Sequence, residues 1–322
     1  MSNSIQEHTM QLSIITINYN NAEGLRKTLA SVAAQTYPNI QHIIVDGNST
    51  DASVEVIREY EQQLASSNSP LASSLKWVSE KDNGIYNAMN KGIEIALSKR
   101  VVNDDHTSSP IANSPSPIAS NDYIQILNSG DILAAHDVTE RMVEAHYKLE
   151  TCPAIFYGNM IKEWPDGRRA KDTCGDKDYT PDSFYYFYRG TLNHDSAYIR
   201  KDLFEKYGLY NEQMKICSDW EWYVRAIVLG GEKTFYINID VTVFDMTGIS
   251  ESDGKNKDLI QKERREYLES VLPAAVLRDY NMLSLPIEQY RRLKKYHLWG
   301  IVYFVERVLF KFEKWSNKLK RK

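Results

Sequence analysis

The feature that most constrains the fold is a repeated succession of short apolar runs and longer amphipathic segments. Residues 12–17 (LSIITI) form an apolar, β-branched run, which is typical of a strand buried on both faces of a parallel sheet. In the segment that follows, residues 22–35, Leu25, Leu29 and Val32 recur at spacings of four and three, as on one face of a helix. Strands joined by helices at short intervals predict an α/β fold with a mostly parallel sheet flanked by helices.

The same alternation continues along most of the chain. Further strands are expected at residues 41–45, 75–79, 123–127, 154–157 and 235–244, and further helices at 52–64, 85–98, 137–149, 201–207 and 218–230. Residues 99–121 are rich in Ser, Pro and Asn, which predicts a mobile surface loop. The aromatic stretch 164–189 is expected to be an irregular loop that faces the substrate. The pattern predicts one α/β domain over residues 1–255 and a helical extension over 256–322.

Charge is distributed unevenly. The total is -4, but residues 288–322 hold eleven Lys or Arg and three Glu, a net +8, which leaves -12 for the rest of the chain. An acidic body with a basic tail argues against nucleic acid as a partner, because the basic residues are confined to one end.

Cysteines and apolar runs bear on the compartment. Cys152, Cys174 and Cys217 are too few and too scattered for a zinc site or a disulfide framework. Residues 1–10 are polar, unlike a secretory signal, and the longest apolar run, residues 298–305, is far shorter than the roughly 20 residues needed to span a bilayer. We therefore expect a cytoplasmic protein.

Three carboxylates follow predicted strands. Asp46, Asp82 and Asp131 each come just after the carboxyl end of a strand, which is the edge where ligands bind in open α/β sheets. For any single Asp, a helix cap or a turn explains the position better than a binding site does. Three such strand ends together predict a shared site.

Neither common phosphate-binding loop is present. The first strand is followed by residues 18–21 (NYNN), without the G-x-G-x-x-G of dinucleotide-binding sheets, and no G-x-x-x-x-G-K-[ST] occurs. A diphosphate bound at this edge would therefore need a divalent cation, Mn²⁺ or Mg²⁺, held by carboxylate. Asp131 is the first choice for that metal ligand.

Four motifs in order resemble those of a known family. They are residues 13–21 (SIITINYNN), 45–51 (VDGNSTD), 79–92 (SEKDNGIYNAMNKG) and 127–131 (LNSGD). Together they resemble family 2 glycosyltransferases, inverting enzymes of GT-A fold, and most of all the bacterial members that build surface polysaccharides or lipopolysaccharides. The resemblance runs from about residue 12 to about residue 250. It implies transfer of a sugar from a nucleotide diphosphate, usually UDP, to a hydroxyl of a glycan or a lipid-linked acceptor.

The resemblance also assigns roles to residues. The nucleotide-binding residues would be Thr16, Asn18, Tyr19, Asp46, Asp82 and Ser129, with Asp46 on the base. Residues 128–131 occupy the place of the family's D-x-D motif, so Asp131 would bind the metal. Asn128 and Gly130 stand where acidic residues are common, which concentrates the metal ligand on Asp131.

The acceptor side is implied by residues 218–221 (SDWE). Asp219 would be the general base that takes the acceptor proton, with Trp220 and Glu221 beside the acceptor; the alternative for Asp219 is a charge that stabilises a helix N-terminus. His194 is a lesser candidate for an acceptor or phosphate contact and equally a structural histidine. Asp245 lies where the family often has a phosphate or metal ligand.

The tail has its own pattern. Apolar residues from Leu298 to Trp315 recur at spacings of three and four, and Arg307, Lys311 and Lys314 lie around them. A basic amphipathic helix of this kind is expected to lie on the inner face of the cytoplasmic membrane through residues 288–322; the alternative is docking on the protein itself or on a second copy.

Two other functions compete with transfer. A nucleotidyltransferase that makes the activated sugar usually begins with a Gly-rich loop, which residues 13–21 lack. A non-catalytic module that binds a nucleotide sugar or a glycan would keep the sheet and lose the chemistry.

Overall fold

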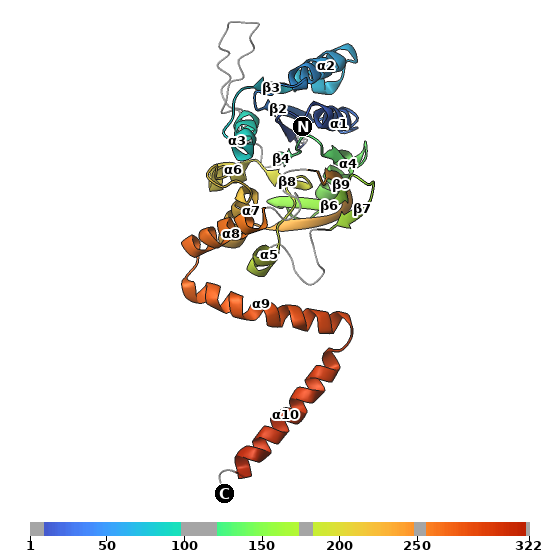
Figure 1. Cartoon of the computed structure of the whole chain (residues 1–322). Helices are drawn as coiled ribbons and strands as arrows, with labels where there is room; N and C mark the ends of the chain where they lie inside the picture. Colours follow the sequence, from blue (N-terminus) through green and yellow to red (C-terminus); the bar gives the residue numbers. More distant parts are fainter. Residues whose placement is uncertain (1–9, 98–120, 174–182, 248–255, 320–322) are drawn as a thin grey trace, which may run out of the picture. The chain divides into compact units, whose positions relative to one another are not determined.

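The computed structural model describes residues 10–97, 121–173, 183–247 and 256–319. The chain forms two compact units, Met1–Arg264 and Arg265–Lys322 (Figure 1). Their boundary lies within helix α8 (Lys257–Val271), whereas the sequence places the end of the catalytic domain at residue 255. The predicted mobile loop lies, apart from Asn121, outside the described residues.

The first unit is built on one sheet of nine described strands in the order β3-β2-β1-β4-β8-β6-β9-β5, with β7 paired to β6. The strands are β1 (Leu12–Asn18), β2 (Ile40–Asp46), β3 (Lys76–Ser79), β4 (Tyr123–Ile126), β5 (Ile132–Leu133), β6 (Ile155–Glu163), β7 (Arg169–Asp172), β8 (Ala197–Arg200) and β9 (Thr234–Asp245). The pairings make β1, β2, β3, β4, β6 and β9 run in one direction and β5, β7 and β8 in the other. The predicted α/β fold with a mostly parallel sheet is confirmed.

Helices cover both faces of the parallel half, as Figure 1 shows for α1 and α3. The face of β1 with Leu12 and Ile14 packs in one core with α1 (Ala22–Ala33) and α2 (Ser53–Ser66). The opposite face, with Ile15, meets α3 (Ile85–Ala96). There Gly92 permits close approach, because a Cβ would lie only 2.3 Å from Ile15 Cγ2. Both faces of β1 are therefore buried, as its apolar run predicts.

The second half of the unit departs from expectation. The stretch 164–189 is not wholly irregular: β7 pairs with β6, and α5 (Phe184–Arg189) follows the residues left undescribed. The helix predicted over 218–230 is α7 (Ser218–Tyr223) continued by the π-helix η2 (Val224–Leu229). The remaining helices of this unit are α4 (Val138–Tyr147) and α6 (Asp202–Tyr207), with a short 3₁₀ turn η1 (Pro70–Ser73).

The second unit is helical. It holds the end of α8 and two long helices, α9 (Ala274–Lys295) and α10 (Trp299–Leu319). None of the residues of α9 is buried. Its ring of Tyr290 lies edge-on to that of Trp299 in α10, with centroids 4.4 Å apart.

Candidate active site

Polar side chains gather at one edge of the sheet because of strand direction. The parallel strands β1, β2 and β3 end there at Asn18, Asp46 and Ser79. Strands β5 and β8 run the opposite way, so the residues just before them, Asp131 and the pair 194–195, arrive at the same edge. The loop before Asp131 lies against the end of β1, since Ser129 N–H donates to the Ile17 carbonyl at 3.0 Å. The end of β1 is in turn paired with the end of β2 at Asp46.

Asp46 is fully buried and fully bonded. Its Oδ1 accepts from Asn18 Nδ2 at 2.8 Å and from Ser49 Oγ at 2.5 Å. Its Oδ2 accepts from the Ser49 backbone N–H at 2.9 Å and from Ser79 Oγ at 2.7 Å. The carboxylate therefore ties together the ends of three strands and the loop before α2.

Two other residues assigned to the nucleotide point inward. Thr16 has no exposed surface, and its hydroxyl lies 3.0 Å from His42 Nε2. Asn18 is 4% exposed and uses its amide nitrogen on Asp46. In this conformation Thr16, Asn18 and Asp46 shape the edge from within, and their direct contact with a nucleotide stays a prediction.

An accessible surface lies just outside this buried group. Tyr19 is 66% exposed, and Asp82 is partly exposed and accepts from Gly84 N–H at 3.0 Å. They converge on Gly47, where a Cβ would lie 2.5 Å from Asp82 Oδ2 and 3.1 Å from the Tyr19 ring. An aromatic face, a carboxylate and bare backbone together suit a flat heterocycle with hydrogen-bond donors.

Asp131 lies where β5 begins and β9 ends. Its Oδ1 accepts from the Asp245 backbone N–H at 2.9 Å, and the side chain is 4% exposed. Burial raises the pKa of Asp131 well above its usual value, and the charges of Asp195 and Asp245 raise it further, against the Asp245 N–H and His194. Negative charge here is poorly compensated by the protein alone.

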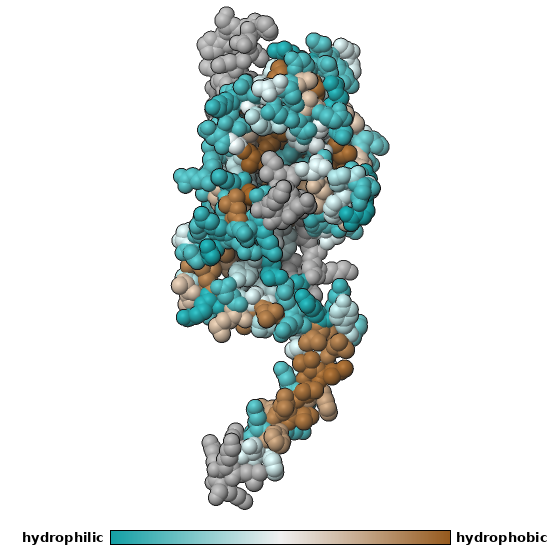
Figure 2. All heavy atoms as spheres, in the orientation of Figure 1, coloured by the Kyte–Doolittle hydropathy of each residue, from teal (hydrophilic) through white to brown (hydrophobic). Residues whose placement is uncertain are grey.

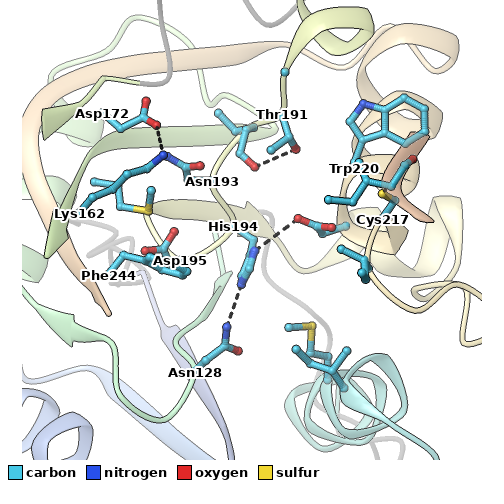
Figure 3. Close-up of a pocket in the computed structure, with 18 of the residues that line it drawn as sticks. Asn128, Lys162, Asp172, Thr191, Asn193, His194, Asp195, Cys217, Trp220 and Phe244 are labelled. Atoms are coloured by element: carbon cyan, nitrogen blue, oxygen red, sulfur yellow. Dashed lines mark hydrogen bonds and ion pairs between the residues drawn. The ribbon is translucent and has the colours of Figure 1, made fainter. Parts of the chain in front are cut away.

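A cavity of about 620 Å³ opens beside this edge. Figure 3 shows His194 near its middle, Lys162 and Asp172 on one side, and Cys217 and Trp220 on the other. Lys162 and Asp172 form an ion pair at 3.3 Å. Asp219 also lines the cavity, whereas Asp131 and the Tyr19 surface do not.

His194 and Asp219 form a partly buried ion pair in this cavity. His194 Nδ1 lies 3.4 Å from Asp219 Oδ2, and the Tyr86 hydroxyl lies 3.0 Å from Asp219 Oδ1. Burial alone would lower the pKa of His194, but the hydrogen bond and charge of Asp219, with Asp195 and Asp131, raise it to about 9. Burial alone would raise the pKa of Asp219, but His194, the Trp220 N–H and Tyr86 bring it below its usual value. At neutral pH the pair is imidazolium and carboxylate.

The other nitrogen of His194 faces Asn128. His194 Nε2 lies 3.2 Å from Asn128 Nδ2, while the buried Asn128 Oδ1 has no hydrogen-bond partner among the described residues. An imidazolium donates from both nitrogens, so rotating the Asn128 amide by half a turn places its oxygen on the Nε2–H and resolves the mismatch. Asn128, in the place of a D-x-D acid, thus supports the charged histidine.

Trp220 and Glu221, which the resemblance places beside the acceptor, differ in whether they line the cavity. Trp220 lines the cavity, and its Nε1–H donates to the Phe187 carbonyl at 2.7 Å, which joins α7 to α5. Glu221 is absent from the cavity wall and forms an ion pair with Arg225 at 2.9 Å. The predicted acceptor contact through Glu221 is therefore corrected: the residue faces the interior of the unit.

The acidic groups fit a cation that arrives with its ligand. No group of three or more His, Cys, Asp or Glu in the described part of the chain could hold a metal unaided. Asp131 nevertheless has one oxygen, Oδ2, without a hydrogen-bond partner there, and Asp245 lies beside it. One or two carboxylates completed by phosphate oxygens and water are what Mn²⁺ and Mg²⁺ use on diphosphates.

Several functional neighbours escape sequence reasoning. Ser49 and Ser79 complete the hydrogen bonds of Asp46, and the Tyr86 hydroxyl donates to Asp219, 133 residues away in the sequence. Arg264 lines the cavity from a charged helix in which nothing marks it out. Ser49, Ser79 and Tyr86 lie within motifs that carry the family resemblance, but the motifs do not show which side chains they contact, and Arg264 lies outside all four motifs.

Comparison with known proteins finds relatives of this chain. Residues 13–110 match the model of Glycosyl transferase family 2. An uncharacterized glycosyltransferase of Mycobacterium tuberculosis is 28% identical over 242 residues, 74% of this chain and 76% of the relative. A PGL/p-HBAD biosynthesis glycosyltransferase of Mycobacterium bovis is 22% identical over 78% of this chain and 81% of its own.

Solved structures share the fold. TarS 1–349 of S. aureus in complex with UDP has a TM-score of 0.54 at 16% identity, covering 83% of this chain and 68% of its own. Mannosyltransferase PcManGT of Pyrobaculum calidifontis, in complex with GDP-Man and Mn²⁺, has a TM-score of 0.50 at 16% identity over 74% and 57%. The fold is therefore that of GT-A glycosyltransferases. The chain is similar to family 2 glycosyltransferases, whose family model matches its residues 13–110.

Proposed function

We propose that the chain moves a sugar from a nucleotide diphosphate, first of all UDP, to an acceptor hydroxyl with inversion at the anomeric carbon. One observation carries the proposal: Asp219, ionised and held by His194 and Tyr86, faces a cavity, and Asp131 lies outside that cavity at the same edge of the sheet. A base on one side and a diphosphate site on the other are what direct displacement requires. The UDP complex of TarS supports the choice of donor.

Asp219 acts as the base in this scheme. Its Oδ atom takes the proton of the acceptor hydroxyl while the acceptor oxygen bonds to the anomeric carbon, and the bond from that carbon to the diphosphate oxygen breaks. His194 keeps the carboxylate ionised and oriented. The displacement occurs from the face opposite the leaving group, so the configuration inverts.

Residues around Asp131 would hold the donor's diphosphate. Mn²⁺ or Mg²⁺ bound by Asp131, with Asp245 beside it, would neutralise the charge of the departing diphosphate. Tyr19 and Asp82 would hold the base, with Asp46 and Ser129 fixing the loops around it. The Mn²⁺ complex of PcManGT supports this reading of the acidic pair.

Hydrolysis of the donor tests the proposal without knowledge of the acceptor. The full chain is incubated with UDP-sugars and Mn²⁺, and released UDP is measured; we expect slow, metal-dependent release that Asp219→Asn lowers strongly. A chain that binds UDP-sugars and never releases UDP, with acceptor extracts or without, would be a binding module instead.

The acceptor is proposed from the relatives. PGL/p-HBAD biosynthesis, named for the Mycobacterium bovis relative, supports a glycan or lipid-linked acceptor, as in the synthesis of surface polysaccharide or lipopolysaccharide. We place this activity in the cytoplasm, at the inner face of the membrane.

Helix α10 supports contact with that membrane. Large apolar side chains such as Phe304 (68% exposed) and Phe312 (62%) are uncovered along it, and Figure 2 shows hydrophobic residues gathered there. Arg307, Lys311 and Lys314 are exposed on the same helix. Apolar side chains beside a basic stripe suit the interface of a bilayer with anionic lipids. Within the described residues, no helix combines the length and apolarity needed to cross a bilayer.

Vesicle sedimentation tests the contact. The full chain should bind vesicles of phosphatidylcholine with phosphatidylglycerol and bind phosphatidylcholine alone weakly. Reversing the charge of Arg307, Lys311 and Lys314 to Glu should remove the binding, since each cation contributes about 1 kcal/mol near such a surface. A chain that ends at Leu285 and sediments as well as the full chain would show that the tail is not the anchor.

A further inference from the structure

Arg264, a cation in the wall of the cavity, has no counter-charge among the residues that the structure describes. Lys162 is paired with Asp172 and His194 with Asp219. Arg264 also lines the cavity but forms no ion pair within the described part of the chain. Burial raises the pKa of the adjacent Cys217 thiol to about 12, so this neighbour stays neutral and provides no negative charge.

Arg264 is held firmly in this position. The preceding residue, Glu263, accepts three backbone N–H groups, from Lys215 at 2.7 Å, Ile216 at 3.2 Å and Cys217 at 3.0 Å. The Arg264 guanidinium lies over the Trp220 ring, 5.0 Å from its centroid. Anchoring on both sides means that little side-chain entropy remains to be lost when a ligand binds.

The guanidinium has an unmade hydrogen bond. Arg264 Nε is buried and has no acceptor among the described residues. A buried charged donor without a partner costs free energy, so a native structure that retains one favours a ligand that completes it. The planar guanidinium fork matches carboxylate and phosphate oxygens, which it binds with two parallel hydrogen bonds.

We propose that Arg264 binds an anionic group, phosphate or carboxylate, on the acceptor, so that the enzyme glycosylates an acidic rather than a neutral acceptor. This inference rests on the proposed function. Trp220, over which Arg264 lies, adjoins Asp219 in the short helix α7. An anion held by Arg264 therefore lies on the side of the proposed base, and it fixes the acceptor relative to Asp219.

The donor's diphosphate is a less suitable occupant. Asp131 and the Tyr19 surface, where the nucleotide and its phosphates are proposed to bind, do not line the cavity that Arg264 lines. A volume of about 620 Å³ is within the range of small-molecule sites and accommodates a sugar unit with its charged group.

Nuclear magnetic resonance of the full chain labelled with ¹⁵N-arginine tests the proposal. The Nε–H signal of Arg264 is assigned with Arg264→Lys, and the protein is saturated with UDP and Mn²⁺. It is then titrated with methyl glucoside, methyl glucuronide, methyl glucoside 6-phosphate and methyl phosphate. We expect saturable shifts of this signal with phosphate or carboxylate probes and none with neutral methyl glucoside. The probe that binds more tightly distinguishes phosphate from carboxylate.

Variants separate a binding role from a structural one. Arg264→Gln should weaken binding of the charged probes at least about tenfold, the loss expected for a charge-assisted hydrogen bond. Arg264→Lys should retain part of it. The control is Arg265→Gln, an exposed neighbour on the same helix, which should change nothing. Thermal melting establishes that each variant is folded.

Three results would overturn the inference: a silent Arg264 signal with every probe, equal shifts with methyl glucoside, or a shift caused by UDP itself that excludes methyl phosphate. The last would assign Arg264 to the donor's diphosphate. Calorimetry of UDP on the same samples keeps the two proposals apart. A chain that does not bind UDP contradicts the proposed function, whereas UDP binding with a silent Arg264 contradicts only the acceptor inference.

Discussion

Two histidines, one in each half of the first unit, differ in their charge at neutral pH. His42 lies under the nucleotide half between the hydroxyls of Thr16 and Tyr60, each 3.0 Å away. Burial without a charged partner lowers its pKa to about 3. His194, beside Asp219 in the cavity, has a pKa raised to about 9. His42 has no exposed surface and His194 is 18% exposed, so burial favours the neutral form of both, and the charge of the partner decides the outcome.

The carboxylates repeat the contrast. The Asp46 carboxylate accepts four hydrogen bonds, whereas the Asp131 carboxylate accepts one within the described residues, from the Asp245 N–H, and has a raised pKa. The nucleotide half is thus a saturated framework that positions loops. The half with Asp131, Asp219 and Arg264 retains charged groups whose interactions a bound substrate would complete.

The largest expected effect is on the base. Asp219→Asn should lower the rate of transfer or donor hydrolysis by about 10²–10⁴, the usual contribution of a positioned base, and leave the fold intact. Released UDP measures the rate, and circular dichroism shows whether the fold is intact. Glu221→Gln, on the same helix but paired with Arg225, should lower stability rather than rate. Full activity of Asp219→Asn would remove it as the base.

A substitution of Asp46 tests whether this carboxylate stabilises the nucleotide half. Asp46→Asn should lower the free energy of unfolding in urea by about 2–4 kcal/mol, because the new amide NH₂ meets donors from Ser49 and Ser79. Asp51→Asn, in an exposed loop, is the control and should cost less. Equal stability of the two variants would contradict a scaffold role for Asp46.

Stability against pH distinguishes the histidines. A raised folded pKa means that the contribution of His194 is complete below about 6.5 and is lost as the pH rises through about 9. Asp219, Asp195 and Asp131 are the charges that face it. Relative to His194→Gln, the wild-type free energy of unfolding should therefore fall by about 3 kcal/mol over that window.

For His42, the contribution to the free energy of unfolding changes with pH in the opposite direction. Its lowered folded pKa means that its contribution is complete above about 6.5 and declines toward acid pH. The difference between wild type and His42→Gln should be flat from pH 6.5 to 9. If the difference in unfolding free energy from wild type changed with pH equally for His42→Gln and His194→Gln in that window, the two histidines would not differ in charge.

The smallest effect is expected at the exposed nucleotide surface. Tyr19→Ala should weaken UDP binding about three- to tenfold through loss of an aromatic contact, measured by calorimetry. Because Tyr19 is 66% exposed, the unfolding free energy should hardly change. An unchanged affinity for UDP would place the base elsewhere.

The parallel half of the fold could be predicted because burial on both faces leaves a plain pattern. The run at residues 12–17 and the helix face of Leu25 and Leu29 each correspond to an observed element. The carboxyl ends of these strands then place Asp46 and Asp82 near one another. Because the parallel strands end at the same edge of the sheet, residues that follow them in the sequence lie close together in the structure.

The other half was less predictable because its contacts are made between distant segments. β7 and α5 within residues 164–189 depend on pairing with β6 and on the bond from Trp220 to Phe187. The roles of His194 and Arg264 depend on which charges lie beside them, which neither periodicity nor a short motif encodes. The inward position of Glu221 likewise follows from its pairing with Arg225.

Titration of UDP with and without Mn²⁺, on wild type and on Asp131→Asn, tests the central claim most directly. The account predicts that Mn²⁺ tightens UDP binding at least about tenfold in the wild type and not in the variant, because Asp131 joins the cation to the diphosphate. Equal binding of UDP with and without the metal, or an equal gain in both proteins, would contradict it.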